Sequence, residues 1–195
     1  MPELLVRVHN MLEVRLLHEA ARDYGKAQES LALTDPLTGL PNRRLLVDRV
    51  SMAMVRARRD QGVMALLYLD LDGFKDINDR SGHGAGDALL KMVAGRLSAA
   101  VREEDTVARL GGDEFVIVLH LSDDADAGPV ALKIIEAVSQ PYDIEGQTVC
   151  ITISAGVALY PVHGENAETL MKSADLALYE AKRSGKNSYR LATKQ

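Results

Sequence analysis

Two acidic clusters have the residue types and the spacing that suit a hard divalent cation. Asp70 and Asp72 end an apolar run, and Asp113 and Glu114 follow a pair of glycines. Carboxylates gathered at strand ends repel one another unless a positive charge lies between them, and Mg²⁺ held by a few carboxylates plus phosphate oxygens meets that need. Each cluster alone is better explained as a turn or a solvated strand end. The metal hypothesis therefore depends on the two clusters converging.

The residues that follow Asp72 have features of a nucleotide site. Gly73-Phe74-Lys75 comes directly after the apolar run, where a sharp turn can present successive backbone N–H groups to a phosphate. Asn78 and Asp87 flank a glycine-rich segment. A carboxylate accepts from N1–H and N2–H₂ of guanine, so an amide and a carboxylate together can recognise that base. Loop capping is the structural alternative for either residue alone.

Other polar residues could support nucleotide binding. Lys182 and Lys186 lie four apart at the end of a predicted helix, where cations also simply complement the helix dipole. His83 lies in the glycine-rich segment, where a histidine is more often a loop residue than a ligand. Gly185-Lys186 is followed by Asn187 and lacks the glycine-rich lead of a Walker A loop, so a nucleotide site here is of another kind.

The elements that must position these residues follow from hydrophobic periodicity. The predicted order after a helix over 42–60 is strand, helix, hairpin, helix, strand, helix, over residues 64–69, 86–100, 106–110 with 115–119, 125–139, 148–159 and 168–184. This order predicts an α/β (α+β) fold with a ferredoxin-like antiparallel sheet and flanking helices. In such a sheet the first strand is central and the hairpin can lie beside it, which would bring the two acidic clusters together.

Two units are expected along the chain. We expect an N-terminal helical stalk over residues 1–33 and the catalytic domain over residues 34–195. The turn-rich segment 34–42 marks the boundary between them. A helix packed on its own domain is an equally good interpretation of the stalk. The alternative is a short coiled-coil seam, because five residues of the stalk recur at heptad spacing: Leu17, Ala20, Tyr24, Ala27 and Leu31.

Composition limits the class of protein. The chain has 195 residues, 47% of them hydrophobic, and a net charge of −5 without a basic stripe, so no nucleic-acid polymer is expected as a partner. The single cysteine, Cys150, excludes an internal disulfide, fits a reducing compartment and is predicted to be buried. The sequence has no run of the roughly 18 apolar residues that a membrane span needs and no signal peptide. We therefore expect a cytoplasmic protein with no membrane partner.

The motifs together resemble the GGDEF family of diguanylate cyclases. Gly111-Gly112-Asp113-Glu114-Phe115 spells the family signature. Its companion motifs stand in order at residues 35–44, 70–75, 78–79, 82–83, 86–87, 154–157 and 174–182. The resemblance covers about residues 34 to 190 and implies a fold of the nucleotidyl-cyclase and polymerase-palm type. It also implies an enzyme that condenses two GTP molecules into cyclic di-GMP and releases two pyrophosphates.

The resemblance implies a role for each candidate residue. The Mg²⁺ or Mn²⁺ ligands would be Asp70, the carbonyl of Leu71, Asp113 and Glu114, with Asp113 also the general base. Guanine would be recognised by Asn78, Asp87 and His83. The triphosphate would be held by the amides of Gly73, Phe74 and Lys75 and by the ammonium groups of Lys182 and Lys186. The family often has arginine at the last position, and lysine keeps the charge but loses the bidentate fork.

Two further features concern regulation. Arg102 and Asp105 form an RxxD sequence that five residues separate from Gly111, a position where relatives have an inhibitory site for the product, cyclic di-GMP. Residues 2–12 resemble the last helix of a response-regulator receiver domain, which suggests that the chain is part of a longer receiver–GGDEF protein. Since one domain holds one GTP, the chemistry requires a homodimer.

Two rival functions remain open. In the first, the chain is a binding module that keeps the RxxD site as a cyclic di-GMP receptor and has lost catalysis, although such relatives usually have a damaged signature and this one is intact. In the second, it is a GTP-binding regulatory module attached to a phosphodiesterase, for which the chain contains no sequence. Incubation with GTP and Mg²⁺ separates these functions from a cyclase.

Overall fold

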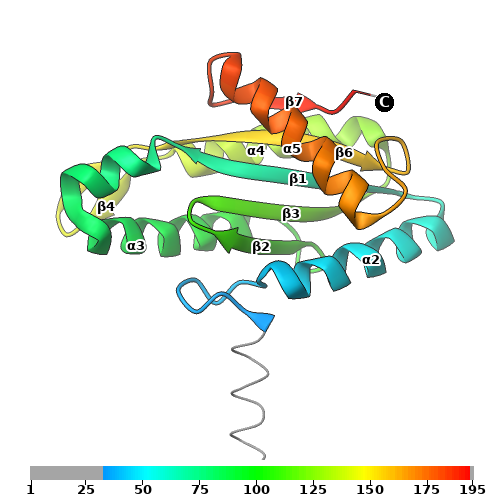
Figure 1. Cartoon of the computed structure of the whole chain (residues 1–195), viewed down its shortest axis with the longest axis horizontal. Coiled ribbons are helices and arrows are strands. Elements are labelled where there is room, and N and C mark those ends of the chain that lie inside the picture. The colour runs from blue at the N-terminus through cyan, green and yellow to red at the C-terminus, as the bar shows by residue number, and fades with distance from the viewer. Residues whose placement is uncertain (1–32, 194–195) are drawn as a thin grey trace, which may run out of the picture.

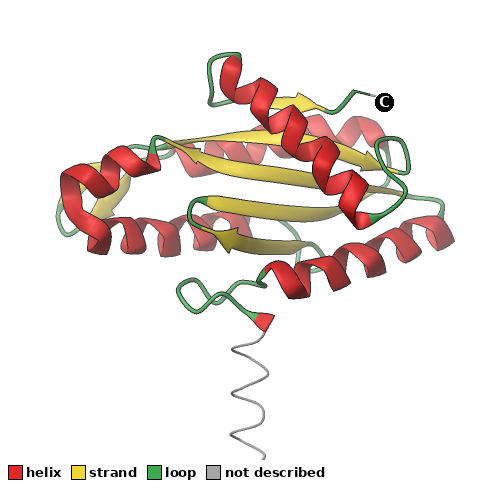
Figure 2. Ribbon diagram, viewed as in Figure 1, coloured by secondary structure: helices red, strands yellow, loops and turns green. Residues whose placement is uncertain are grey.

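The computed structural model describes residues 33–193, which form a five-stranded sheet with helices on both faces (Figures 1 and 2). The strands of the sheet are β1 (Val63–Asp72), β2 (Thr106–Gly111), β3 (Glu114–Leu121), β6 (Thr152–Tyr160) and β7 (Tyr189–Leu191). The helices are α2 (Arg43–Asp60), α3 (Phe74–Ala100), α4 (Ala127–Ser139) and α5 (Ala167–Arg183), with a short 3-10 turn, η1 (Asp124–Asp126), before α4. The predicted stalk and its heptad seam lie outside the described residues.

The strand order is β2-β3-β1-β6-β7, so the first strand is central and the signature hairpin lies beside it. This confirms the predicted fold class. β1 pairs antiparallel with both β3 and β6. In this register Asp70 lies opposite Glu114 on one side and Ser154 on the other. The sheet thus fixes which polar residues meet at the end of β1.

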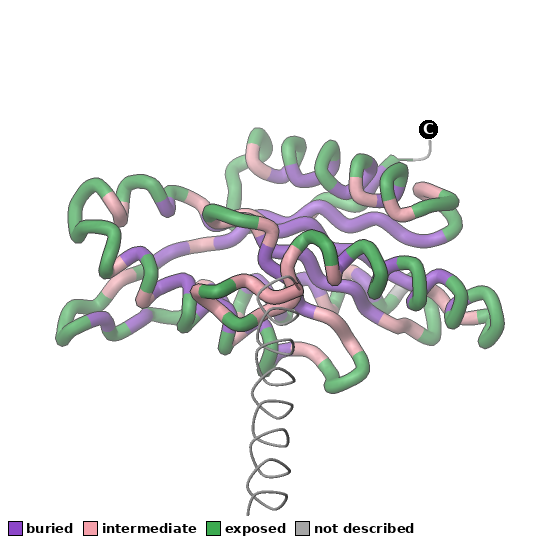
Figure 3. The backbone as a smooth tube through the Cα atoms, turned by 60° about the horizontal axis from the view of Figure 1, so that its bottom comes forward, coloured by how far each residue is buried: buried purple, intermediate pink, exposed green. Residues whose placement is uncertain are grey.

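The central strand is buried on both faces, as its continuous apolar sequence predicts. Residues Leu66 and Tyr68 pack with α2 and α5, whereas Leu67 and Leu69 pack with α3 and α4. Figure 3 shows this arrangement as a buried sheet between helices whose outer surfaces are exposed. Because side chains alternate along a strand, Asp70 continues the face that α5 covers.

The structure corrects two predicted boundaries. Helix α3 begins at Phe74 rather than at residue 86, and it continues through a kink at Gly82, whose φ of 83° and ψ of 163° are not helical. The glycines predicted a loop because glycine is a poor helix former; Gly82 does interrupt the helix, but the residues on both sides of it are helical. The predicted strand 148–159 is divided into β5 (Gln147–Val149), which pairs with β4 (Tyr142–Ile144), and β6.

Two features of the C-terminal half were not anticipated. Strand β7 pairs in parallel with β6 and adds an edge to the otherwise antiparallel sheet. Cys150 is exposed, so the prediction that it is buried was wrong. It lies at the bend between β5 and β6, where Ile151 instead turns into the core. Within the described part of the chain, no helix combines the length and the apolarity needed to cross a membrane.

Candidate active site

The two acidic clusters lie together at the end of β1. Asp70 is the direct cross-strand partner of Glu114, the first residue of β3. The backbone N–H of Leu71 donates to the carbonyl of Asp113 at 3.3 Å. The sheet register therefore brings Asp70, Asp113 and Glu114 to one edge of the domain. Asp70 and Glu114 belong to strand ends, and Asp113 lies in the hairpin turn directly before Glu114.

The hairpin that carries Asp113 depends on its two glycines. Gly111 and Gly112 have φ values of 140° and 51°, which residues with a side chain rarely adopt. The β2–β3 register also shifts between Arg109 and Gly111, so a bulge precedes the turn. A bulge next to a turn re-aims the residues that follow it. The glycine pair therefore sets the direction in which Asp113 leaves the hairpin.

A buried arginine fixes this hairpin to the segment before α2. Arg109 is 8% exposed, and its guanidinium donates to the carbonyl of Gly112 at 2.7 and 3.1 Å and to Oδ1 of Asp35 at 2.9 Å. The same oxygen of Asp35 accepts from the backbone and the hydroxyl of Thr38. Sequence reasoning treated segment 34–42 as a boundary and missed this contact. An isolated Asp and a distant Arg give no spacing signal that would reveal it.

Charge is concentrated around Asp70. Burial is the largest cause that raises the pKa of this carboxyl group, and the carboxylates of Asp113 and Glu114 add to the rise. The ammonium of Lys182 opposes them, with Nζ 2.7 Å from Oδ2 of Asp70. A buried carboxylate among other carboxylates is a place where a cation is favourable. Lys182, which sequence reasoning assigned to phosphate, is thus the cation nearest to the candidate metal ligand.

The donor set fits Mg²⁺ rather than a metal that needs an all-protein cage. Among residues 33–193, no group of three or more His, Cys, Asp or Glu side chains is arranged to hold an ion by itself. Mg²⁺ is usually bound by one or two carboxylates together with waters and substrate phosphates. Asp70, Asp113 and the carbonyl of Leu71, the ligands expected from the sequence, are the groups that could form such a partial shell, and the sheet register brings Asp70 and Asp113 to the same edge of the domain.

Tyr68 contacts the same cluster. Its hydroxyl donates to Oε2 of Glu114 at 3.3 Å. Burial is the largest cause that raises the pKa of Tyr68, and together with the carboxylates of Glu114 and Asp175, and against the opposing charge of Arg43, it brings this pKa to about 12. The phenol therefore remains protonated at neutral pH and stays a donor to Glu114. Nothing in the spacing of the sequence marked Tyr68 as more than a core residue.

The predicted phosphate-binding amides lie at the N-terminus of α3. Gly73 is the N-cap residue, with φ of 82°, and Phe74 and Lys75 form the first turn. The first N–H groups of a helix have no partner within it, and together with the helix dipole they suit an anion. Lys75 is exposed, whereas Phe74 is buried. The segment 73–75 is thus the start of a helix rather than a loop, and its backbone N–H groups are still suited to a phosphate.

The predicted guanine-recognition residues lie on α3 on either side of its kink. Asn78 and Asp87 are nine positions apart, yet the carboxamide of Asn78 lies directly against Gly86: a Cβ at that glycine would be 1.9 Å from Oδ1 of Asn78. The kink at Gly82 therefore folds the two ends of the segment together. Asp87 and His83 are exposed. The structure thus brings Asn78 beside Gly86, which directly precedes Asp87, and leaves His83 exposed.

Lys186 and Asp72 differ in how they relate to the site. Lys186 is exposed in the loop after α5, and its backbone has φ of 61°. Asp72 belongs to the first acidic cluster, but its oxygens accept from the hydroxyls of Thr152 and Ser154, each at 2.8 Å. Asp72 is therefore engaged with β6 rather than left open beside Asp70.

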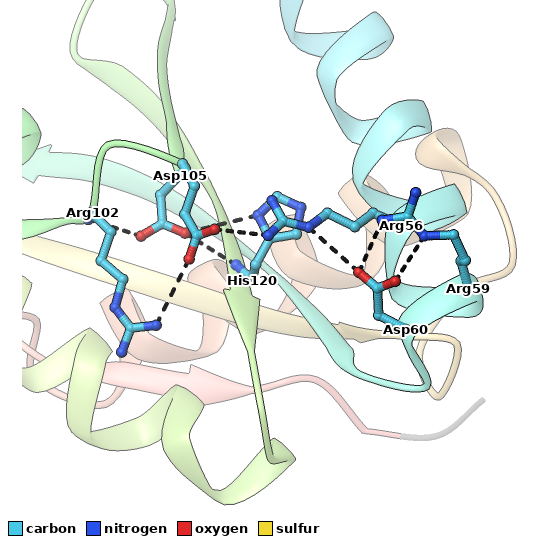
Figure 4. Close-up of polar contacts among 7 residues, drawn as sticks. Arg56, Arg59, Asp60, Arg102, Asp105 and His120 are labelled. Carbon is cyan, nitrogen blue, oxygen red and sulfur yellow. Dashed lines mark hydrogen bonds and ion pairs between the residues drawn. The ribbon is translucent and has the colours of Figure 1, made fainter.

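The RxxD residues lie in the turn between α3 and β2 (Figure 4). Asp105 accepts from the backbone N–H of Arg102 at 2.9 Å and of His120 at 3.1 Å, and its side chain is 5% exposed. The side chain of Arg102 is 74% exposed, 3.9 Å from a carboxylate oxygen of Glu104. Asp105 is thus part of the turn, whereas Arg102 is available to an external anion.

Two hollows border this turn. One of about 320 Å³ is lined by Arg102, Asp105, His120 and Lys133, among others, and one of about 350 Å³ is also lined by Arg102 and Asp105. His120 Nδ1 is buried without a hydrogen-bond partner among the described residues and lies 4.0 Å from Asp105. Burial lowers the pKa of His120, as does Arg56, which Figure 4 shows on its other side, so the imidazole is neutral at neutral pH.

The palm-like sheet, the acidic strand ends and the kinked α3 define a nucleotidyl-cyclase type of domain. Comparison with known families makes this specific. The family described as "Diguanylate cyclase, GGDEF domain" matches residues 32–188. The chain therefore belongs to the GGDEF family of diguanylate cyclase domains.

Individual relatives agree. The chain is 51% identical over 159 residues to the bifunctional diguanylate cyclase/cyclic di-GMP phosphodiesterase MucR of Pseudomonas aeruginosa, covering 82% of the chain and 23% of MucR. It resembles the solved GGDEF domain of TpbB from the same organism, with a TM-score of 0.79, 44% identity, and 82% and 94% of the two chains covered. The solved coiled coil and GGDEF domain of DgcB from Caulobacter crescentus, in complex with c-di-GMP, gives a TM-score of 0.80 at 30% identity, with 93% and 99% covered. The chain thus spans about a quarter of the length of MucR.

Proposed function

We propose that this chain is a diguanylate cyclase, which condenses two GTP molecules into cyclic di-GMP and releases two pyrophosphates. The observation that carries the proposal is the meeting of Asp70 with Asp113 and Glu114 at the strand ends, on an intact signature hairpin. A binding module needs no such concentration of carboxylates, which costs stability unless a cation offsets it. Membership of the cyclase family supports the same function.

In the proposed reaction, Asp70, Asp113 and the carbonyl of Leu71 hold the divalent cation, with Glu114 assisting. When bound, the cation polarises the α-phosphate and lowers the pKa of the attacking 3′-hydroxyl. Asp113 accepts the proton of that hydroxyl as its oxygen forms a bond to the α-phosphorus and the bond to pyrophosphate breaks. Tyr68 keeps Glu114 in place by donating to Oε2.

The remaining residues position the nucleotide. Asn78 and Asp87 recognise guanine, with His83 beside them on the kink. The triphosphate is held by the N-terminal amides of α3, from Gly73 to Lys75, and by the ammonium groups of Lys182 and Lys186. Positioning of this kind supplies much of the rate in phosphoryl transfer.

One domain carries one set of these residues, so two domains must face each other. Each 3′-hydroxyl then attacks the α-phosphate of the GTP on the opposite domain, and the second attack closes the ring. We propose a homodimer for this reason. The stalk at residues 1–33 is the candidate tether, with a receiver domain upstream as the proposed input.

We also propose that the product inhibits the enzyme by binding at the 102–105 turn. Arg102 and Lys133 are two cations on the rim of the 320 Å³ hollow, which suits an anionic dinucleotide. The solved DgcB domains that resemble this chain are in complex with c-di-GMP. A domain that kept this hollow but lacked catalysis would be the receptor named above as a rival.

The deciding experiment is incubation of the 195-residue chain with GTP and Mg²⁺, followed by chromatographic identification of the product. Asp113→Ala should abolish cyclic di-GMP formation while leaving the circular dichroism spectrum and the melting temperature close to those of the parent. Glu165→Ala removes an exposed carboxylate in the loop before α5 and is the matched control. Parent-like turnover by Asp113→Ala would refute the proposed chemistry, and an inactive parent that still binds cyclic di-GMP would favour the receptor.

A further inference from the structure

The carboxylate of Asp72 connects three parts of the chain. Its Oδ1 accepts from the hydroxyl of Ser154 at 2.8 Å, and its Oδ2 accepts from the hydroxyl of Thr152 at 2.8 Å and from the backbone N–H of Asn187 at 3.1 Å. Ser154 is fully buried. The three donors are two hydroxyls and an amide, so this carboxylate joins β1 to β6 and to the loop that follows α5.

That loop has an unusual backbone. Lys186 and Asn187 follow a glycine and have φ values of 61° and 43°. Residues with a side chain keep such angles only where surrounding contacts hold them there. Lys186 N–H donates to the carbonyl of Ala181 at 3.2 Å, and the hydroxyl of Ser139 donates to Oδ1 of Asn187 at 3.0 Å. The contact to Asp72 is the charge-assisted one of these three and is expected to be the strongest.

The anchored amide lies one residue from a lysine of the site. Because Asn187 directly follows Lys186, the place at which its N–H is held sets where the Lys186 side chain begins. Asp70 and Asp72 are two residues apart on one face of β1. Asp70 contacts Lys182 directly, whereas Asp72 holds the loop that carries Lys186. Neighbouring carboxylates of one strand thereby locate both lysines.

We propose that Asp72 is a positioning residue, which fastens the loop after α5 to the end of β1 so that Lys186 reaches the triphosphate of GTP. The inference rests on the proposed function, in which Lys186 binds the triphosphate. It gives the second aspartate of the Asp70-Leu71-Asp72 motif a task different from metal binding. Substrate affinity, rather than the chemical step, then depends on Asp72.

Asp72→Asn tests this because it keeps the shape of the side chain but turns one acceptor into an amide donor. We expect Kd for a non-hydrolysable GTP analogue with Mg²⁺ to rise about tenfold, the size of one weakened ionic hydrogen bond, and KM to rise with little change in kcat. Asp143→Asn is the matched control: Asp143 accepts from Gly146 N–H at 2.9 Å in the β4–β5 turn, where Glu145 and Gly146 also have positive φ. It should leave Kd unchanged.

A double-mutant cycle with Lys186→Met gives a readout that general destabilisation would not produce. If Asp72 acts through Lys186, Asp72→Asn should raise Kd by less than about twofold when Lys186 is already methionine. An equal rise in both backgrounds would overturn the inference while leaving the proposed cyclase intact. If Lys186→Met alone leaves Kd unchanged, the triphosphate role of Lys186 is wrong and the inference falls with it, although the Asp113→Ala test still decides the chemistry.

Asp72→Glu is the second variant in case Asp72→Asn does not fold. It keeps the charge and the acceptors but moves the carboxylate by one methylene, and the same cycle applies to it. Thr152→Val removes a β6 donor while leaving the contact to Asn187 in place. We expect it to lower the melting temperature without changing Kd. A loss of affinity equal to that of the Asp72 variants would show that Asp72 acts through the sheet, which contradicts the inference.

Discussion

Nζ of Lys182 on α5 lies 2.7 Å from Oδ2 of Asp70 on β1, so the carboxylate at the centre of the acidic cluster already has a positive partner. Even so, burial and the carboxylates of Asp113 and Glu114 raise the pKa of Asp70. A raised pKa in the folded chain means that ionisation at neutral pH lowers the free energy of unfolding. The ionised carboxylate of Asp70 therefore lowers the stability of the folded chain.

This predicts opposite effects of Asp70→Asn on activity and on stability. The variant should make no cyclic di-GMP, yet at pH 7 without nucleotide its free energy of unfolding should be higher by about 1 kcal/mol, because a repelling charge is removed. Urea unfolding followed by circular dichroism measures the change. A variant less stable than the parent would show that the ion pair with Lys182 outweighs the repulsion.

The Arg109–Asp35 contact predicts a pH effect. Burial alone would raise the pKa of Asp35, but hydrogen bonds from Thr38 and Arg109 outweigh it and hold the pKa below its ordinary value of 3.8. The contribution of this carboxylate to stability is therefore full above about pH 3.8 and is lost as the pH falls through the lower, folded-state pKa. Asp35→Asn should lower the free energy of unfolding by about 2 kcal/mol at pH 7.

The difference between Asp35→Asn and the parent should shrink as the pH is lowered below that point, and urea unfolding at several pH values measures it. Asp124→Asn changes an exposed carboxylate before α4. Its free energy of unfolding should fall at acid pH in the same way as that of the parent. A constant difference between Asp35→Asn and the parent across the acid range would contradict the assignment.

Two neighbouring glycines should respond differently to the same substitution. A Cβ at Gly86 would lie 1.9 Å from Oδ1 of Asn78, whereas a Cβ at Gly84 meets nothing within 4 Å. Gly86→Ala should therefore displace Asn78 and raise KM for GTP by about tenfold or more, since a misplaced recognition group loses its hydrogen bonds. Gly84→Ala should leave KM close to the parent value. Steady-state kinetics measure this difference. Equal KM values for the two variants would show that Asn78 does not take part in the recognition of guanine.

Recognition of guanine also predicts that GTP is used and ATP is rejected. Adenine presents an N6 amino donor where guanine has an acceptor, and it lacks the N1–H and N2–H₂ donors that a carboxylate such as Asp87 can bind. Product formation from each nucleotide at equal concentration measures the preference. Comparable turnover of both would contradict the assigned roles of Asn78 and Asp87.

Product inhibition should depend on Arg102. Because its side chain is exposed and borders two hollows away from the strand ends, Arg102→Ala should raise the inhibition constant for cyclic di-GMP about tenfold or more while changing the initial rate little. Arg190→Ala removes an exposed arginine on β7 and should change neither. Equal inhibition of Arg102→Ala and the parent would exclude a product site at this turn.

The requirement for two facing domains predicts that specific activity rises with protein concentration. The stalk can raise the local concentration of a second domain to about the millimolar range. Deleting residues 1–30 should therefore lower specific activity in dilute solution, and the loss should shrink as the protein is concentrated. Analytical ultracentrifugation of both chains accompanies the assay. A truncated chain with unchanged, concentration-independent activity would show that the stalk plays no such part.

Sequence reasoning succeeded where a signal is local and periodic. Alternating and helical hydrophobic patterns predicted α2, β1, the β2–β3 hairpin and α5 to within a few residues. Two of its local predictions were wrong. The glycines before residue 86 predicted a loop that is in fact the first part of α3, and the apolar neighbours of Cys150 predicted burial for an exposed side chain.

The candidate site divides in the same way. By itself, the sequence determined the family, the order of its motifs and the kinds of group available for metal and nucleotide, because these depend on residue type and spacing along the chain. Only the tertiary structure showed how two similar aspartates differ in their partners: Asp70 contacts Lys182, whereas Asp72 accepts from Thr152 and Asn187. It also showed that Arg109 holds the hairpin through Asp35, 74 residues away. Contacts between residues so distant depend on sheet register and loop position, which no local spacing records.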